Sequence, residues 1–171
     1  VVQIGLGPLG RMIPPYIVER DGLEMVSAVD IDPDLKGTSL AELCNMETNT
    51  NVLVTDDLEE AASSADVAVI TTVSEFAGLQ PLLERVIDLG LHVVSTCEEL
   101  SYPWKTAPAL SAEVDALAKE KGVAVLGTGV NPGFLMDFLP TAATAVCRRV
   151  ERVLVERIQD ASFRRLPFRQ K

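Results

Sequence analysis

Short apolar runs alternate with segments of helical spacing along most of the chain. Residues 66–73 are apolar for most of their length, whereas residues 75–90 place leucine, valine or isoleucine every three or four positions. Continuous apolar strands are typical of a parallel sheet buried on both faces, with helices as the crossovers. The chain is too short for eight strand–helix units, so an open sheet is favoured over a barrel. The pattern predicts an α/β fold with a doubly wound parallel sheet.

This alternation predicts a regular series of elements. The expected strands are residues 1–7, 23–32, 51–57, 66–73, 91–99 and 123–129, and the expected helices are residues 8–22, 38–45, 58–65, 75–90, 107–122 and 132–149. Pro14 and Pro15 fall inside the first of these helices and should kink or interrupt it. The apolar run at residues 152–158 predicts one more strand.

Composition excludes several classes of protein. The chain has 171 residues, 47% of them hydrophobic, which is ample for a buried core. No stretch approaches about 20 uninterrupted apolar residues, and no signal peptide is visible, so we expect no membrane partner. Three scattered cysteines, Cys44, Cys97 and Cys147, favour a reducing, cytoplasmic setting. A single His without a paired Cys motif argues against a metal site.

Charge is unevenly distributed along the chain. Residues 1–147 carry 7 basic and 22 acidic side chains, whereas residues 148–171 carry 8 basic and 3 acidic ones. The acidic bulk would repel a phosphate backbone, so we expect no nucleic-acid partner. The basic segment is a solvated rim or an anion pocket for a substrate carboxylate.

A glycine motif follows the first expected strand and opens the first expected helix. Its residues are Gly5, Leu6, Gly7, Pro8, Leu9 and Gly10. In this context Gly5 permits a tight turn, Gly7 lets the backbone approach a pyrophosphate, and Gly10 lets the helix pack closely on the sheet. The motif predicts a Rossmann-like dinucleotide-binding domain, with a glycine turn that binds no ligand as the alternative.

Asp30 lies twenty residues beyond Gly10, at the end of the second expected strand. A carboxylate there accepts hydrogen bonds from the adenosine ribose and repels a 2′-phosphate. Asp32 and Asp34 add to the repulsion, which predicts NAD as the cofactor. Lys36 keeps NADP open.

Further candidate residues lie at the carboxyl ends of later strands, where ligands bind in such sheets. The expected cofactor-binding residues are Thr71, Thr72, Ser74, Ser95, Thr96, Cys97, Asn131 and Pro132. Asn131 is placed to hold the nicotinamide carboxamide, and Pro132 to begin the next helix at its first position. Cys97 has no base placed to activate it, because His92 lies in the same strand, so we interpret it as a packed residue.

Four segments together carry a resemblance to a known family. These are GLGPLGR, STCEELSYPW, GTGVNPGFLMDFLP and QDASFRRLPF. The chain resembles the 2,4-diaminopentanoate dehydrogenases and related NAD(P)-dependent amine dehydrogenases, which are similar to dihydrodipicolinate reductase in fold. Members of this group are roughly twice as long. The resemblance implies a dinucleotide-binding Rossmann domain over 1–135 and, over 136–171, a linking helix and the first strand of a truncated α+β substrate domain.

Glu98 and Glu99 are the candidate catalytic residues. A carboxylate beside the nicotinamide can take the proton of a substrate ammonium and later activate water. The resemblance implies a catalytic Glu in this block, and we favour Glu98 because it is nearer the strand end; the alternative is that the pair caps the following segment. Tyr102 and Trp104 would form an aromatic wall or simply pack.

Arg164 and Arg165 complete the expected site. The resemblance places their segment at the entrance of the substrate domain, where they would bind a substrate carboxylate in a bidentate way.

The sequence thus predicts an oxidoreductase acting on the CH–NH₂ group of a small amine or amino acid, and a homo-oligomer in full-length form. Reduction of C=N or C=C bonds of the dihydrodipicolinate reductase type, and a nucleotide-binding module without chemistry, are the alternatives.

Overall fold

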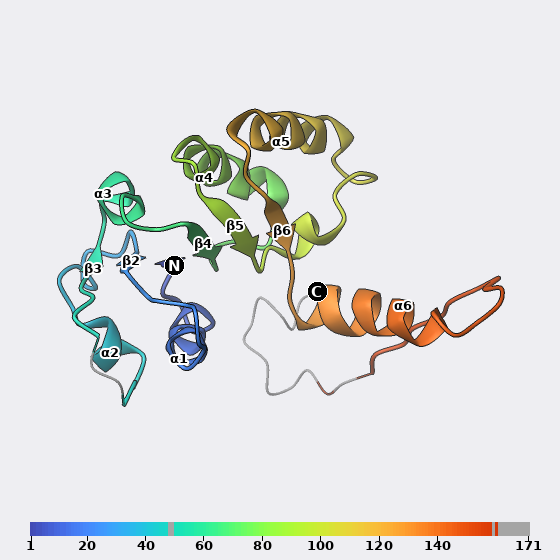
Figure 1. The fold of residues 1–171 in the computed structure, drawn as a ribbon, viewed down its shortest axis with the longest axis horizontal. Coiled ribbons are helices and arrows are strands. Elements are labelled where there is room, and N and C mark those ends of the chain that lie inside the picture. The colour runs from blue at the N-terminus through green and yellow to red at the C-terminus, as the bar shows by residue number, and fades with distance from the viewer. Residues whose placement is uncertain (48–49, 159, 161–171) are drawn as a thin grey trace.

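One parallel sheet organises the protein. The computed structural model describes residues 1–47, 50–158 and 160. Within these residues the sheet has six strands in the order β3-β2-β1-β4-β5-β6 (Figure 1). The strands are β1 (Val2–Ile4), β2 (Ser27–Val29), β3 (Val54–Thr55), β4 (Val67–Ile70), β5 (His92–Ser95) and β6 (Val125–Gly127). All five pairings are parallel, which confirms the doubly wound Rossmann-like fold.

Helices cover both faces of the sheet. The covering helices are α1 (Pro14–Val18), α2 (Leu40–Leu43), α3 (Leu58–Ala62), α4 (Phe76–Asp88) and α5 (Pro108–Lys121), whereas α6 (Leu139–Thr144) has no buried residue. Figure 1 shows α3, α4 and α5 on one side of the sheet and α1, α2 and α6 on the other. The larger core cluster joins the strands to α3, α4 and α5, and a smaller one lies under α1 and α2.

Helix α4 illustrates why these segments fold as they do. Its buried residues are Phe76, Leu79, Leu83, Val86 and Ile87, and each lies three or four positions from another, so that they share one face. Burying each such side chain contributes roughly 1.5–3 kcal/mol. Because this face of α4 packs against the sheet, it holds in place the strand ends from which the site is built.

The first helix is interrupted, as the sequence predicts. A single 3₁₀ turn, η1 (Gly10–Met12), is followed by α1, which begins at Pro14. Proline is tolerated in a first helical turn because the amide there has no helical acceptor. The two prolines therefore start a short helix rather than kink a long one.

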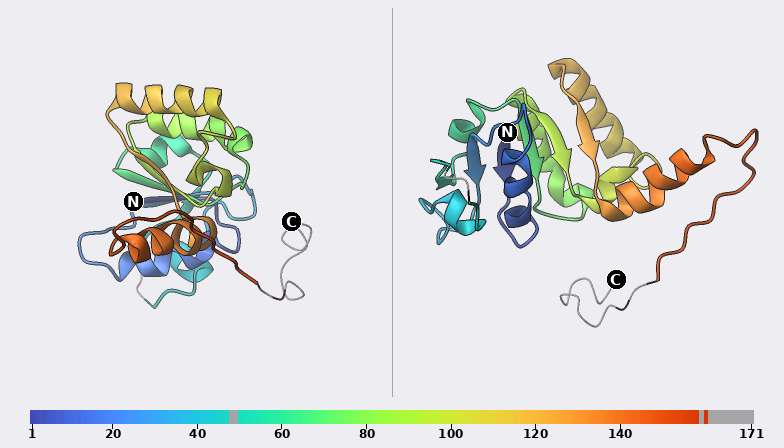
Figure 2. Two further views of the ribbon diagram at one scale, coloured as in Figure 1. Left: turned by 90° about the vertical axis from the view of Figure 1, so that its right-hand side faces the viewer. Right: turned by 60° about the horizontal axis from the view of Figure 1, so that its bottom comes forward.

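Two predictions after β6 are wrong. Pro132 does not begin a helix, because Asn131, Pro132 and Gly133 have non-helical backbone angles inside the wide turn η3 (Val130–Phe138). Residues 152–158 form no strand. A strand needs a neighbouring strand to complete its backbone hydrogen bonds, and Figure 2 shows this segment leading away from the sheet. The expected domain boundary near residue 135 stays a prediction.

The order of the strands reverses on either side of β1. Strands β2 and β3 lie to one side of it, and β4, β5 and β6 lie to the other. Loops that follow β1 and β4 therefore separate to opposite faces and leave a crevice outside the carboxyl ends of these strands. No helix among the described residues has the length and apolar character needed to cross a bilayer.

Candidate functional site

The three glycines of the loop after β1 have different surroundings. Gly5 has φ +88°, and a Cβ there would lie 2.9 Å from the Thr72 methyl carbon. A Cβ on Gly10 would lie 2.0 Å from the Gly5 carbonyl oxygen. Gly7 has no heavy atom within 4 Å of its Cβ position. The protein itself requires the first and third glycines, whereas Gly7 borders open space.

The Asp30 carboxylate is hydrogen-bonded to this loop. Its Oδ2 accepts from the Leu6 N–H at 2.6 Å and its Oδ1 from the Asp32 N–H at 2.9 Å. Arg11 holds the next peptide group, since its Nε donates to the Leu6 carbonyl at 2.7 Å. The half-buried Asp30 carboxylate therefore lies between the end of β2 and the glycine loop, a link that the spacing alone did not reveal.

A cavity of about 410 Å³ adjoins Asp30. Its walls are mainly apolar and include Gly5, Asp30, Ile31, Thr72, Val73 and Leu82. Mainly apolar walls, with Asp30, Asp56 and Arg85 among the lining residues, suit a flat heteroaromatic ring carrying a hydroxylated sugar. Thr72, expected at the site from its place after β4, lies on this cavity.

Thr71 was expected at the cofactor site, but it does not line this cavity. Its hydroxyl donates to the Gly5 carbonyl at 2.8 Å, and its N–H donates to the Ile4 carbonyl at 2.9 Å. Both groups are directed into the protein because the end of β4 runs beside the glycine loop. The Ser74 backbone holds the segment that follows β5. Its carbonyl accepts from the Cys97 thiol at 3.2 Å and from the Glu99 N–H at 3.2 Å.

The end of β5 is held against both neighbouring strands. The Ser95 side chain is buried, its Oγ accepts from the Cys97 N–H at 3.1 Å, and its carbonyl accepts from the Thr128 N–H at 2.8 Å. The Thr96 N–H donates to the Ile70 carbonyl at 3.1 Å. Burial raises the pKa of the Cys97 thiol, because desolvation disfavours the thiolate. A buried, protonated thiol is a poor nucleophile, which agrees with the interpretation of Cys97 as a packed residue.

The two glutamates after β5 occupy different environments. Both belong to the 3₁₀ turn η2 (Glu98–Ser101). The Glu99 Oε2 accepts from the Phe76 N–H at 2.8 Å and so caps the start of α4, which has no capping side chain of its own. Glu98 is half-buried and adjoins Cys97 at the strand end. Glu99 thus caps an earlier helix, whereas the capping alternative expected the pair to cap the segment that follows it.

A second cavity, of about 570 Å³, lies at the carboxyl end of β6. Its walls include Tyr102, Phe134, Asp137 and Phe138, and the two phenylalanine rings stack with centroids 6.0 Å apart. The Asp137 Oδ2 accepts from the Gly133 N–H at 2.7 Å. Sequence reasoning missed Phe134, Asp137 and Phe138. Their i, i+3 and i+4 spacing, which places them on one helical face, is the signal that would have grouped them.

Tyr102 and Trp104 do not form one aromatic wall. Trp104 lines a separate groove of about 390 Å³ between α5 and β6, with Leu100 and Val125. The backbone turns between the two aromatic residues, so their side chains, 64% and 48% exposed, meet different cavities. Asn131 is exposed in η3. Arg164 and Arg165 lie outside the described residues.

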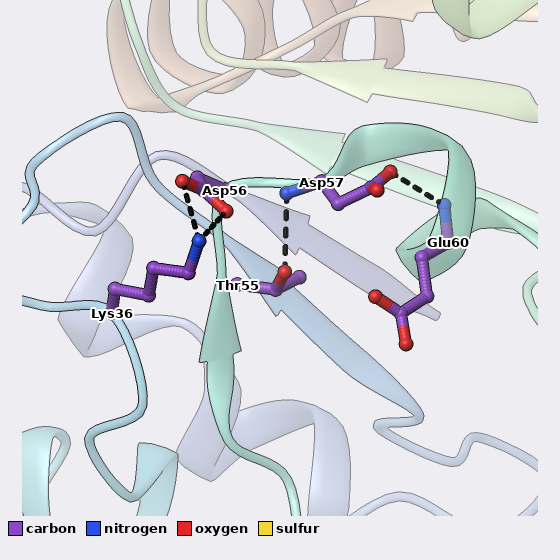
Figure 3. A network of polar contacts seen from close by, with 5 residues as sticks. All are labelled: Lys36, Thr55, Asp56, Asp57 and Glu60. Carbon is purple, nitrogen blue, oxygen red and sulfur yellow. Dashed lines mark hydrogen bonds and ion pairs between the residues drawn. The ribbon is translucent and has the colours of Figure 1, made fainter.

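A polar network lies around the end of β3, and one of its residues, Asp56, lines the first cavity (Figure 3). The Lys36 Nζ lies 2.8 Å from Asp56 Oδ2 and 2.6 Å from its Oδ1. Hydrogen bonding within this pair raises the pKa of Lys36 and lowers the pKa of Asp56. Asp57 donates its N–H to Thr55 and caps α3 by accepting from the Glu60 N–H at 2.9 Å. The Lys36 ammonium is therefore already paired with the Asp56 carboxylate.

These features together define a class of protein. A doubly wound sheet with a glycine loop, an acidic residue and an apolar cavity at the strand-order reversal is a dinucleotide-binding domain. The family model described as "Dihydrodipicolinate reductase, N-terminus" matches residues 1–97, more than half of the chain. The chain belongs to this family.

Individual relatives agree with this assignment. The chain is 32% identical over 165 residues to 2,4-diaminopentanoate dehydrogenase from Acetoanaerobium sticklandii, covering 95% of this chain and 46% of that protein. The solved structure of an amine dehydrogenase from Mycobacterium smegmatis superposes with a TM-score of 0.75 at 30% identity, covering 86% of this chain and 44% of that one. The structure of GenD2 from gentamicin A biosynthesis in complex with NAD shares the fold, with a TM-score of 0.62 at 22% identity over 86% of this chain and 38% of that one. The chain spans less than half the length of each of these proteins.

Proposed function

We propose that this chain binds NAD and forms the cofactor-binding part of an oxidoreductase acting on the CH–NH₂ group of a small amine or amino acid. The observation that carries the proposal is the arrangement around the glycine loop. Open space lies in front of Gly7, and Asp30 connects that loop to the apolar cavity. The names of the relatives as amine and diaminopentanoate dehydrogenases support the reaction class.

The residues present fit a dinucleotide. The cavity beside Asp30 would take the adenosine, with Asp30 accepting from the ribose hydroxyls. The loop from Gly5 to Gly10 would take the pyrophosphate, because Gly7 leaves its backbone uncovered. Thr96 and Asn131, at the ends of β5 and β6, would flank the nicotinamide, which when bound supplies the hydride acceptor.

Charges around the adenosine cavity favour NAD over NADP. Asp30, Asp32 and Asp34 follow β2 and would repel a 2′-phosphate. Of the cations that could offset them, Arg85, which lines the cavity, is paired with Glu59, and Lys36 is paired with Asp56. A 2′-phosphate would have to compete with that carboxylate for the ammonium.

Glu98 is the residue we assign to proton transfer. It is half-buried at the start of η2 and is nearer the end of β5 than Glu99, which is exposed. Glu98 would take a proton from the substrate ammonium, so that the neutral amine can lose a hydride from its carbon. It would then release that proton to solvent, and the restored carboxylate would take a proton from the water that attacks the iminium. The cavity with Tyr102 and Phe138 would take the substrate, since aromatic faces attract a cation and Asp137 adds a negative charge.

The family description favours a second candidate reaction, reduction of a C=N or C=C bond in a cyclic imine of the dihydrodipicolinate type. The two reactions differ in their substrates. A cyclic imine would be reduced with NADH or NADPH without release of ammonia.

Titration with NADH and NADPH tests the cofactor proposal. We expect NADH to bind more tightly by at least about tenfold, since the 2′-phosphate meets like charges. Asp30→Asn keeps an acceptor for the Leu6 N–H but removes the charge, so it should narrow this preference while the chain stays folded. Asp115→Asn is the matched control, because its carboxylate pairs with Lys119 on α5 and does not line the cavity beside Asp30. A folded chain that binds neither nucleotide would overturn the proposal.

Turnover assays on the whole enzyme, of which we propose this chain to be the cofactor-binding part, test the reaction. We expect 2,4-diaminopentanoate or a simple amine to reduce NAD⁺, and Glu98→Gln to abolish this reduction while leaving NADH binding unchanged. Glu99→Gln should retain most activity. Reduction of a cyclic imine alone would favour the second candidate reaction. Nucleotide binding with no turnover of any amine or imine would indicate a binding module and would refute the oxidoreductase assignment.

A further inference from the structure

A buried polar side chain lies beneath the glycine loop. Gln3, in the middle of β1, is 0% exposed. Its neighbours in the sheet register are the apolar Ala28 and Val69, which belong to or pack on the core cluster under α1 and α2. Its Oε1 has no hydrogen-bond partner among the described residues. Burying an unpaired amide oxygen costs stability, and an apolar side chain would avoid that cost. The contribution of Gln3 must therefore lie in what its amide nitrogen holds.

The amide nitrogen of Gln3 and the hydroxyl of Thr71 hold the same carbonyl. Gln3 Nε2 donates to the Gly5 oxygen at 3.0 Å and to Thr71 Oγ1 at 2.9 Å. Thr71 Oγ1 in turn donates to the Gly5 oxygen at 2.8 Å. The Gly5 carbonyl is thus directed inward by two donors, one from β1 and one from the end of β4.

The other end of the same peptide group is also held. The Leu6 N–H, which follows the Gly5 carbonyl, donates to Asp30 Oδ2 at 2.6 Å. Side chains from three strands therefore determine the orientation of the Gly5–Leu6 peptide. Gly10 leaves the space that this arrangement needs, because a Cβ there would lie 2.7 Å from Thr71 Oγ1 and closer still to the Gly5 oxygen.

We infer that Gln3 and Thr71 are positioning residues of the nucleotide site, which hold the glycine loop in the conformation that receives a pyrophosphate. The inference rests on the proposed cofactor function. Neither side chain reaches the open space in front of Gly7, so both act through the Gly5–Leu6 peptide. A loop ordered before the ligand arrives binds it more tightly, because association does not have to order the backbone. Substitution of either residue should therefore lower the affinity for ligands that carry a pyrophosphate and leave the affinity for ligands without one unchanged.

Binding of ADP and of adenosine to the same variants separates these cases. Adenosine fits the cavity beside Asp30, whereas ADP adds the pyrophosphate. Gln3→Met removes both donated hydrogen bonds together with the unpaired oxygen, at similar length. We expect its melting temperature to be unchanged or higher, its ADP affinity to fall about tenfold, the usual effect of one or two lost hydrogen bonds, and its adenosine affinity to change little.

Variants at Thr71 and a distant control complete the design. Thr71→Ser keeps the hydroxyl and should bind ADP as the unaltered chain does, whereas Thr71→Val should lose ADP affinity. Ser111→Ala is the matched control, because it removes another buried hydroxyl, which donates to the Ala107 carbonyl at 2.8 Å in α5. It should lower stability without changing the ratio of ADP to adenosine affinity.

The outcomes distinguish this inference from the function on which it rests. Equal losses of ADP and adenosine affinity, or ADP affinities that simply follow melting temperature across all variants, would overturn the positioning role. So would unchanged ADP binding by folded Gln3→Met. If the unaltered chain binds neither ADP nor NADH, the proposed function fails together with the inference.

Discussion

Substitution of the second and third glycines should separate stability from cofactor affinity. An Ala at position 10 would place its methyl carbon 2.0 Å from the Gly5 oxygen, whereas ordinary contacts are 3.4–4 Å, so the helix start and the loop must move apart. Overpacking of this kind costs about 1–3 kcal/mol. Each kcal/mol lost from the free energy of unfolding lowers the melting temperature of a chain of this length by about 2–4 °C. We therefore expect Gly10→Ala to melt about 2–12 °C lower than the unaltered chain.

Gly7→Ala should have the opposite profile. Nothing lies within 4 Å of its Cβ position, so the added methyl group meets no protein atom. A surface change of this kind alters stability by no more than about 0.5 kcal/mol. The methyl group does occupy the space that we assign to the pyrophosphate, and a steric cost of ~1.4 kcal/mol or more weakens NADH binding at least tenfold.

Thermal melting and NADH titration at one salt concentration measure both quantities on the same samples. The reasoning is refuted if Gly7→Ala lowers the melting temperature as much as Gly10→Ala does. It is also refuted if folded Gly7→Ala binds NADH as tightly as the unaltered chain, because the open space would then not be where the pyrophosphate lies.

Three further predictions concern the surroundings of the site. Asp56→Asn frees the Lys36 ammonium and should raise the ratio of NADPH to NADH affinity about two- to fivefold, the value of an exposed ion pair; an unchanged ratio in parallel titrations would show that Lys36 does not reach the 2′ position. Glu99→Ala removes the acceptor for the first amide of α4 and should lower the free energy of unfolding in urea by about 1 kcal/mol, whereas no loss would contradict the capping role. At mildly alkaline pH, iodoacetamide should modify the exposed Cys147 and leave Cys97 unmodified until the chain is denatured, because burial raises the pKa of the Cys97 thiol; mass spectrometry that finds Cys97 alkylated in the folded chain would contradict its burial.

Local sequence pattern was enough to predict the order and type of nearly every element up to β6. Apolar runs marked the strands because a doubly covered parallel sheet buries both faces of each one. The expected helix over residues 107–122 ended at Gly122, and Gly122 does close α5 with φ 71°, whereas Pro14, expected inside a longer helix, begins α1. The same reasoning failed after β6. Gly133 has φ 119° inside η3, and the apolar residues 152–158 have no strand beside them.

The candidate site divides in a similar way. The glycine loop and Asp30 were predictable, because their spacing follows from one strand–helix–strand unit. The roles of Thr71 and Glu99 were not, since the partners of their side chains lie 66 and 23 residues away in the chain. Residue type and spacing carry the information for local geometry, whereas the direction of a side chain at a strand end depends on strand register and on the loops packed against it. The inward turn of Thr71 beneath the glycine loop arises only when β1 and β4 lie side by side.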